Sequence, residues 1–202
     1  MPVIVVPFAG VEGKTRLHAL HEARRALSLA MLGDVLEAAF AVGTTHLVTA
    51  DRDGAAVARG LGAGVLDDPG GGQGNAVRAA LAALEAHPVV LVNADVPCVR
   101  PADLRGLVAA TPDGGVALVA AQDGTTNALS LPGPHAFAPL FGPGSAARFR
   151  DHAAALGLES VLADIPNLAD DVDTIEDLQR LRHRVGSRTH ACLSELPVEV
   201  LR

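Results

Sequence analysis

Three aspartates stand at positions suited to holding a metal ion. Asp95 ends the most apolar run of the chain, "PVVLVNAD", and Asp171 and Asp173 lie just before a helix start in "DDVDTIEDL". In open α/β sheets the ligand crevice lies beyond the carboxyl ends of the strands, where a carboxylate is placed to bind rather than to pack. Oxygen ligands favour a hard cation, and Mg²⁺ is the natural occupant when phosphates complete its shell.

Each acid also has a structural interpretation. Thr174 and Asp177 have capping-box spacing, so Asp171 and Asp173 equally suit the electrostatics of a helix start. Asp95 is also a candidate cap for the helix near 101–107, although Asp103 is better placed for that first turn. We expect one of Asp171 and Asp173 to face the crevice directly, and the other to act through a bend, a water or a second metal.

A cationic loop follows the first apolar run. "VEGKTRL" holds Lys14, the only lysine of the chain, and Arg16 two residues later. Two cations beside glycine-containing backbone suit a polyphosphate, although a solvated basic loop is the plain alternative. "GKT" also resembles a P-loop, but the glycine that this motif requires five positions before Gly13 is replaced by Phe8.

Two further loops are suited to binding a nucleotide or an anion. "DPGGGQGNAVRAAL" offers backbone groups and the amides of Gln73 and Asn75 to a base, or else is a surface loop with Asn75 as the N-cap. "FGPGSAARF" predicts Ser145 as the N-cap of a helix, with free backbone N–H groups after it that form an anion-binding site. Thr126, in "QDGTTNALSL", either binds an anion with its hydroxyl or closes the turn.

Composition excludes several other classes of protein. The net charge is −7, aromatic residues make up 2%, and Trp and Tyr are absent, which argues against a nucleic-acid partner. "MPVIVVPFAG" has no basic n-region and is too short to span a membrane, so we expect a cytoplasmic protein with no membrane partner. Cys98 and Cys192 lie far apart in the sequence, which argues against a zinc site or a disulfide framework.

The periodicity predicts a single α/β domain. Short apolar runs at 3–7, 46–50, 88–95 and 115–121 alternate with helical patterns at about 22–41, 75–84 and 176–185. Continuous apolar strands between helices indicate a mostly parallel sheet covered on both faces, and a strand at 128–133 would make the sheet mixed. We assign 1–186 to this domain and 187–202 to a C-terminal tail that packs on the core, meets a partner chain or is loose.

Taken together, the motifs "VVPFAGVEGKTRLHAL", "DPGGGQGNAVRAAL", "LVNADVPCV", "GTTNAL", "FGPGS" and "DVDTIEDL" resemble, in this order, the guanylyltransferases of coenzyme F(420) biosynthesis. The resemblance covers residues 1–186. It implies a Rossmann-like nucleotidyltransferase fold of the glycosyltransferase-A kind. The implied reaction joins GTP to phosphoenolpyruvate or 2-phospho-L-lactate and releases pyrophosphate, with a deazaflavin transferase as a downstream partner.

The resemblance also assigns roles to residues. Lys14 and Arg16, with Asp95, would be catalytic, and the nucleotide would bind at Gly10, Lys14, Gln73, Gly74 and Asn75. The phospho-acid would bind at Thr126, Gly142 and Ser145, and Mg²⁺ at Asp95, Asp171 and Asp173. The chain departs from the family pattern at Phe8 and Thr15, and "GQGN" is a variant of the usual loop.

Two questions remain open on the sequence alone. The arginine-rich composition is typical of GC-rich genomes, and because bacterial members tend to use phosphoenolpyruvate we favour that acceptor. A P-loop-type phosphotransferase and a catalytically silent nucleotide-binding module on the same fold are the alternatives. The sequence is also compatible with a homo-oligomer.

Overall fold

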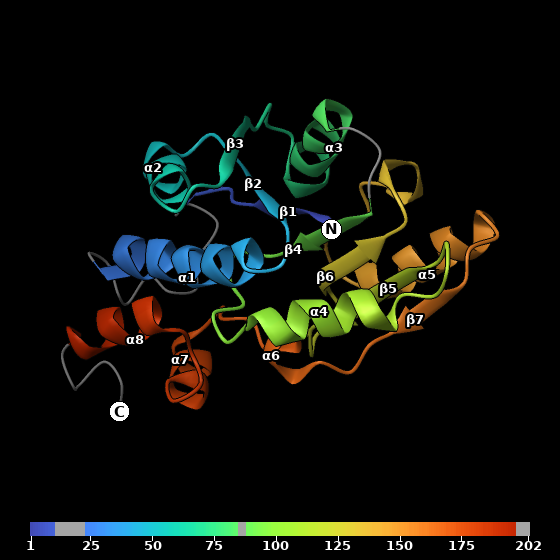
Figure 1. Cartoon of the computed structure of the whole chain (residues 1–202). Coiled ribbons are helices and arrows are strands. Elements are labelled where there is room, and N and C mark those ends of the chain that lie inside the picture. Colours follow the sequence, from blue (N-terminus) through green and yellow to red (C-terminus); the bar gives the residue numbers. More distant parts are fainter. Residues whose placement is uncertain (11–22, 85–87, 197–202) are drawn as a thin grey trace.

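A seven-stranded mixed sheet forms the centre of the structure (Figure 1). The structure is a computed structural model and describes residues 1–10, 23–84 and 88–196. The strand order is β3-β2-β1-β4-β6-β5-β7. Four neighbouring pairs are parallel, and β6 runs antiparallel to both β4 and β5. The strands are β1 (Val3–Pro7), β2 (Thr44–Thr49), β3 (Gly64–Asp67), β4 (Val89–Val92), β5 (Val116–Ala120), β6 (Thr126–Leu131) and β7 (Ser160–Leu162).

The predicted mixed, mostly parallel sheet is confirmed. All four strands predicted from apolar runs are present, and the optional strand predicted at 128–133 is β6, which begins two residues earlier. The two edge strands, β3 and β7, were not predicted. They have only four and three residues, and no residue in either is fully buried, so neither has the continuous apolar pattern that marks a central strand.

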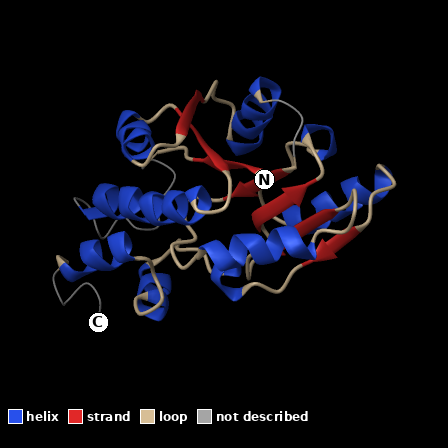
Figure 2. Ribbon diagram, viewed as in Figure 1, coloured by secondary structure: helices blue, strands red, loops and turns tan. Residues whose placement is uncertain are grey.

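Helices cover both faces of the sheet (Figure 2). One apolar core joins the sheet to α1, α2, α4 and α6, and a second joins the opposite face to α3 and α5. The helices are α1 (Ala23–Phe40), α2 (Arg52–Gly60), α3 (Gln73–Ala83), α4 (Pro101–Ala110), a 3-10 turn (Pro134–Ala136), α5 (Ser145–Ala155), α6 (Pro166–Ala169), α7 (Ile175–Leu181) and α8 (Ser187–Ser194). Among the described helices, none is long and apolar enough to cross a membrane.

The alternation of side chains along β1 divides the two cores. Ile4 and Val6 belong to the core under α1, whereas Val3 and Val5 belong to the core under α3. Successive side chains of a strand point to opposite faces, so an all-apolar strand can satisfy both layers at once. All five residues of β1 are buried. This strand lies between β2 and β4, and it therefore forms the central support of the fold.

A third apolar cluster joins α1 to α7 and α8, which lie below α1 in Figure 1. Leu193 of α8 and Leu181 of α7 pack there with Leu27 and Met31 of α1. Helix α8 lies within the segment that the sequence left as a tail. The helix predicted at 176–185 ends at Leu181, where the chain turns toward α8.

Asp34 of α1 completes the N-terminus of α8. Its carboxylate accepts hydrogen bonds from the backbone N–H groups of Arg188 at 3.0 Å and Thr189 at 2.9 Å. Asp34 is only 5% exposed, and the N-cap residue Gly186 makes no side-chain cap. A carboxylate from another helix thus satisfies two N–H groups that would otherwise lack a partner, and it lies at the positive end of the helix dipole.

We expect Asp34→Ala to lower the free energy of unfolding by about 2 kcal/mol, because two N–H groups at the start of α8 lose their acceptor. Urea denaturation measures this difference. The matched control is Glu37→Ala on the same helix. Glu37 pairs with Arg188 at 3.3 Å through exposed side chains, and we expect a change below about 0.5 kcal/mol. Equal losses in the two variants would contradict this account of α8.

Candidate active site

A cavity of about 340 Å³ opens where the strand order reverses between β1 and β4. The residues after the two strands, Pro7–Gly10 and Asn93–Asp95, form its floor, and Ser28 and Met31 of α1 line one side. Gln73, at the start of α3, lines the other. Reversal points of open α/β sheets leave a crevice at the carboxyl ends of the strands, and this cavity lies at that point.

Two of the three predicted metal-binding acids line this cavity. Asp95 and Asp173 both lie on its wall, and the backbone N–H of Val172 donates to the carbonyl oxygen of Asp95 at 2.9 Å. This hydrogen bond ties the acidic segment to the end of β4. Asp171 does not line the cavity. Within the described residues, no three His, Cys, Asp or Glu side chains lie close enough together to hold a metal ion by themselves.

The capping box predicted at Thr174 and Asp177 is present. Thr174 is the N-cap of α7, and its hydroxyl accepts from the N–H of Asp177 at 3.2 Å. The Asp177 carboxylate accepts in return from the N–H groups of Thr174 at 3.0 Å and Asp173 at 3.2 Å. The cap therefore fixes the backbone of Asp173 as well as the start of the helix. Asp103 likewise serves the first turn of α4, as expected, by accepting from the N–H of Arg100.

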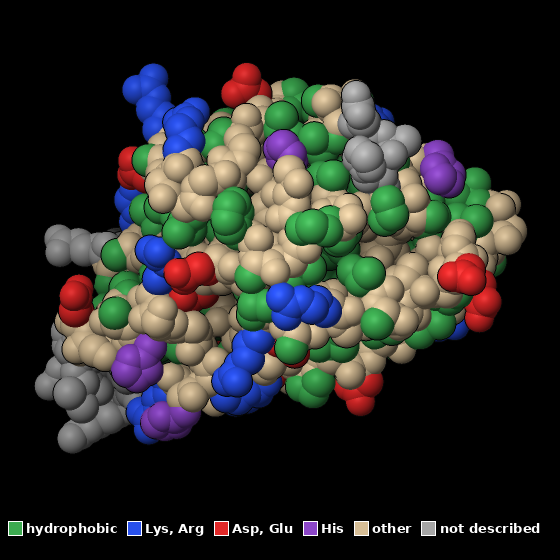
Figure 3. All heavy atoms as spheres, viewed as in Figure 1, with side chains coloured by type: hydrophobic (Ala, Val, Ile, Leu, Met, Phe, Trp, Pro, Cys, Tyr) green, Lys and Arg blue, Asp and Glu red, His purple; other side chains and the backbone are tan. Residues whose placement is uncertain are grey.

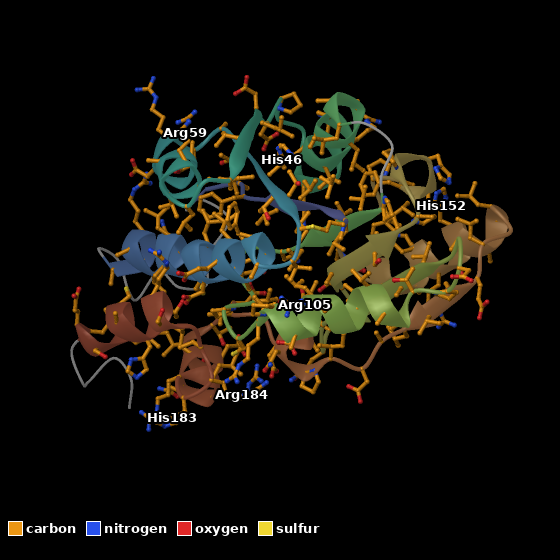
Figure 4. The ribbon with its side chains drawn as sticks, in the orientation of Figure 1. His46, Arg59, Arg105, His152, His183 and Arg184 are labelled. Atoms are coloured by element: carbon orange, nitrogen blue, oxygen red, sulfur yellow. The ribbon has the colours of Figure 1, made fainter. Side chains whose placement is uncertain are left out.

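Asp170 anchors the acidic segment from its other side. Its carboxylate binds Arg180 through one oxygen and Arg184 through the other, the latter at 2.7 Å. Burial alone would raise the pKa of Asp170, but the hydrogen bonds and charges of the two arginines outweigh burial and lower it. Arg184, which is labelled in Figure 4, also donates to Asn167 of α6 at 2.8 Å. The sequence analysis did not single out Asp170, because nothing in "ADDVDT" separates it from its neighbours.

The glycine-rich loop adopts backbone angles that favour glycine. Gly70, Gly71 and Gly72 all have φ between 81° and 90°, and Gly72 is the N-cap of α3. The expectation that Asn75 is the N-cap is wrong, because the helix begins two residues earlier. Asn75 lies in the first turn, where its amide donates back to the carbonyl oxygen of Gly70 at 2.5 Å and so holds the loop closed.

Residues of three segments are linked by side-chain amides beside the cavity. Gln73 Nε2 donates to Asn93 Oδ1 at 2.7 Å, and Asn93 Nδ2 lies 3.3 Å from Asn127 Oδ1. Asn127 Nδ2 reaches the carbonyl oxygen of Ala169 at 3.3 Å. Sequence reasoning missed Asn93 and Asn127. Asn93 directly follows the all-apolar strand β4, and this break in pattern was an available signal. Asn127 lies near the start of β6, which also holds Thr126 and Ser130, so the pattern there offered no such signal.

A second cavity of about 540 Å³ adjoins the first, and both are lined by Gly72 and Gln73. Its other walls are the first turn of α3 and the segment before α5, including Gly142. These two elements approach closely, since a Cβ at Gly74 would lie 2.9 Å from the Cα of Pro139. The cavity is thus bounded on one side by the predicted nucleotide loop and on the other by the predicted phospho-acid loop.

The predicted phospho-acid residues lie together. The Ser145 hydroxyl donates to the Thr126 hydroxyl at 3.0 Å, and both residues are at most 1% exposed. Gly142 has a φ of 109°, and its carbonyl oxygen accepts from the N–H of Ser145 at 3.0 Å. Two expectations were wrong here. The N-cap of α5 is Gly144, and the amides of Ser145 and Ala146 are not free, because the carbonyl oxygens of Gly142 and Gly124 accept from them.

The remaining predicted residues are a glycine and two cations. Gly10 lies in the first cavity with a φ of 81°, whereas Lys14 and Arg16 lie outside the described residues. Cys98 is buried, and burial raises the pKa of its thiol to about 11, which does not suit a nucleophile. On the face seen in Figure 3, acidic and basic side chains are interspersed rather than gathered in one basic patch.

We expect Asp170→Ala to lower the free energy of unfolding by about 2 kcal/mol, because Arg180 and Arg184 lose a common partner that is almost fully buried. The loss stays below that of a fully buried ion pair, since both arginine side chains are 41% exposed. Urea denaturation tests this value. Asp164→Ala, which removes an exposed acid nearby, is the control and should change stability little. A loss no larger than in the control would contradict an anchoring role for Asp170.

Solved structures of similar fold include nucleotide-dependent transferases. A protein described as a nucleotide-diphospho-sugar transferase from Desulfovibrio desulfuricans G20 superposes with a TM-score of 0.79 at 18% identity and covers 100% of this chain and 98% of its own. Glucosyl-3-phosphoglycerate synthase from Mycobacterium tuberculosis, solved in complex with Mn²⁺ and uridine diphosphate, gives a TM-score of 0.53 at 14% identity over 92% of this chain and 80% of its own. These likenesses confirm the expected nucleotidyltransferase type of fold.

Sequence comparison identifies the family. Phosphoenolpyruvate guanylyltransferase of Conexibacter woesei is 38% identical over 191 residues, which cover 90% of this chain and 86% of the relative. The enzyme of the same name from Streptomyces scabiei is 37% identical over 96% of this chain and 95% of its own length. The family model described as "Guanylyl transferase CofC like" matches residues 2–201. The chain therefore belongs to the family of CofC-like guanylyl transferases.

Proposed function

We propose that this chain transfers the guanylyl group of GTP to phosphoenolpyruvate, with release of pyrophosphate, in coenzyme F(420) biosynthesis. One observation carries the proposal. Two cavities meet at Gly72 and Gln73. One is lined by Asp95 and Asp173, and the other by Gly142, whose carbonyl oxygen accepts from the N–H of Ser145. A transferase that joins two phosphorylated substrates needs two adjoining sites of this kind, and the sequence relatives carry the name of the activity.

The nucleotide occupies the first cavity in this proposal. Gly10 and Gln73 line that cavity, and Gly74 and Asn75 continue from it along the first turn of α3. Lys14 and Arg16 follow Gly10 in the sequence, so we assign them to the triphosphate. A compact ammonium suits a polyphosphate that shifts during reaction, whereas the planar fork of arginine fixes one geometry.

The carboxylates fit a divalent cation. Asp95 and Asp173 share a cavity wall and offer only oxygen ligands, which suits Mg²⁺ together with phosphate oxygens. Asp171 does not line this cavity and would complete the site through a water or a second ion. A solved structure of similar fold contains Mn²⁺ with a nucleotide diphosphate, which supports a divalent ion as part of the proposed reaction. When bound, the ion would supply charge neutralisation at the reacting phosphates.

Phosphoenolpyruvate is assigned to the side of Thr126, Gly142 and Ser145. Its phosphate oxygen attacks the α-phosphorus of GTP and forms the new P–O bond, and the bond from the α-phosphorus to the oxygen bridging the α and β phosphates breaks as pyrophosphate leaves. The attacking oxygen already carries a negative charge, so the reaction needs no general base. The contribution of the protein is alignment of the two phosphates and stabilisation of charge.

The partners follow from this reaction. Both substrates are metabolites of the cytoplasm, where we place the activity, and a downstream transferase would pass the product to a deazaflavin acceptor. The proposal involves neither a nucleic acid nor a membrane. A homo-oligomer is compatible with it.

The first experiment is a pyrophosphate-release assay with Mg²⁺ and GTP, run with phosphoenolpyruvate, with 2-phospholactate and without acceptor, each with and without the downstream transferase and its acceptor. We expect release that depends on phosphoenolpyruvate. Asp95→Asn and Asp173→Asn should each lower kcat/KM at least about 100-fold, as loss of transition-state charge stabilisation does elsewhere. Asp171→Asn should lower it less, and the exposed control Asp164→Asn should leave it unchanged.

The alternatives give different results in the same assay. Release of inorganic phosphate or GDP would identify a phosphotransferase, and GTP binding with no product under any condition would identify a silent nucleotide-binding module. Release that depends only on 2-phospholactate would change the acceptor and leave the reaction type intact.

The phospho-acid site has its own test. We expect Ser145→Ala to raise the KM for phosphoenolpyruvate about ten-fold, since one hydroxyl hydrogen bond to a charged group is lost, and to leave the KM for GTP unchanged. Steady-state kinetics and a thermal midpoint are measured together, because Ser145 is fully buried. Ser194→Ala, at an exposed serine in α8, is the control. Equal rises in both KM values would place Ser145 outside the acceptor site.

A further inference from the structure

The side-chain amides of Gln73, Asn93 and Asn127 form a chain of hydrogen bonds, called here the amide chain. Backbone groups fix which amide donates and which accepts in it. Asn127 Nδ2 contacts the carbonyl oxygen of Ala169, and Asn93 Nδ2 contacts the carbonyl oxygen of Thr126 at 3.2 Å. A backbone carbonyl can only accept a hydrogen bond, so each asparagine must turn its NH₂ group toward that carbonyl. The Asn93 Oδ1 atom is then left facing Gln73.

This direction decides how Gln73 is oriented. Asn93 Oδ1 can only accept, so Gln73 must present its NH₂ group to it, as the 2.7 Å contact requires. The carbonyl oxygen Oε1 and the second N–H of the NH₂ group remain for a ligand. Gln73 lines both cavities, at the point where they meet. A glutamine is normally free to exchange donor and acceptor by rotation, but rotation here would set two carbonyl oxygens against each other.

We propose that Gln73, locked by Asn93, is a specificity-determining residue that selects guanine over adenine through its fixed carbonyl oxygen. The inference rests on the proposed function, which puts the base of GTP beside this residue. Guanine has two neighbouring donors on its Watson–Crick edge, N1–H and the 2-amino group. Adenine has one donor beside an acceptor, N1. With Oε1 opposite N1 of the base and the remaining N–H opposite position 6, the fixed amide accepts from guanine N1–H and donates to guanine O6. With adenine, the same two groups would meet the lone pair of N1 and the 6-amino group.

A purely structural role for the amides makes a different prediction. The same contacts also join the start of α3 to the end of β4 and to the start of β6, so Gln73 and Asn93 would in that case serve only to hold these segments together. Loss of either side chain would then weaken binding of every nucleotide equally. Selection between bases is thus the readout that separates the two roles.

The experiment measures Kd for GTP and for ATP by calorimetry in the presence of Mg²⁺, and kcat/KM for both with phosphoenolpyruvate. The variants are Gln73→Ala, Asn93→Ala and the double variant, with Gln122→Ala at an exposed glutamine as control. We expect the wild type to prefer GTP and each single variant to lose about ten-fold of that preference, the size of one hydrogen-bond difference. The double variant should lose no more than Gln73→Ala does, because Asn93 acts only by orienting Gln73.

Three results would overturn the inference: no preference for GTP in the wild type, equal weakening of GTP and ATP in the single variants, or additive losses in the double variant. The binding arm does not depend on turnover. If the wild type releases no pyrophosphate, and the variants nevertheless lose the preference for GTP over ATP in binding, the proposed function is refuted and the role of Gln73 is retained. If the wild type shows acceptor-dependent release of pyrophosphate and the variants keep the wild-type preference for GTP, the proposed function is retained and the role of Gln73 is refuted.

Discussion

The reversal of strand order between β1 and β4 is the constraint on which the rest of the structure depends. The chain builds outward from β1 to β2 and β3 on one side, then returns to place β4 on the other. The residues at the carboxyl ends of these two neighbouring strands line the first cavity. Asp95 reaches the cavity because it lies three residues beyond the end of β4. Any insertion between β4 and Asp95 would separate the acid from the cavity.

The acidic segment is then held in place by contacts that do not themselves reach the cavity. Val172 bonds to the backbone of Asp95, Asp170 is bound by two arginines, and Asp177 accepts from the N–H of Asp173. Each contact fixes the backbone on one side of Asp173 and leaves the Asp173 side chain on the cavity wall. A site that must bring two negative carboxylates near polyphosphate needs such external support, because the carboxylates repel one another until a cation is bound.

Sequence reasoning succeeded where one physical pattern determined one structure. Buried apolar runs such as 3–7 predicted strands, and the spacing of Thr174 and Asp177 predicted a helix start. It failed where several residues of one type competed. "GGGQGN" contains five possible caps for α3, four glycines and Asn75, and only the φ angles in three dimensions select Gly72. Ser145 looked like a cap for the same reason, yet its hydroxyl bonds to Thr126, nineteen residues earlier in the chain.

The amide chain illustrates a kind of information that a sequence does not carry. Asn93, Asn127 and Gln73 are unremarkable singly, and their spacing of twenty and thirty-four residues matches no motif. Their orientation is set by two backbone carbonyls, which belong to the fold rather than to the side chains. The same chain joins the floor of the first cavity to the strand that carries Thr126. A polar network of this kind is favourable only when every member is satisfied, so a change at one end alters the geometry at the other. The two substrate sites of the proposed reaction therefore share structural support as well as a wall.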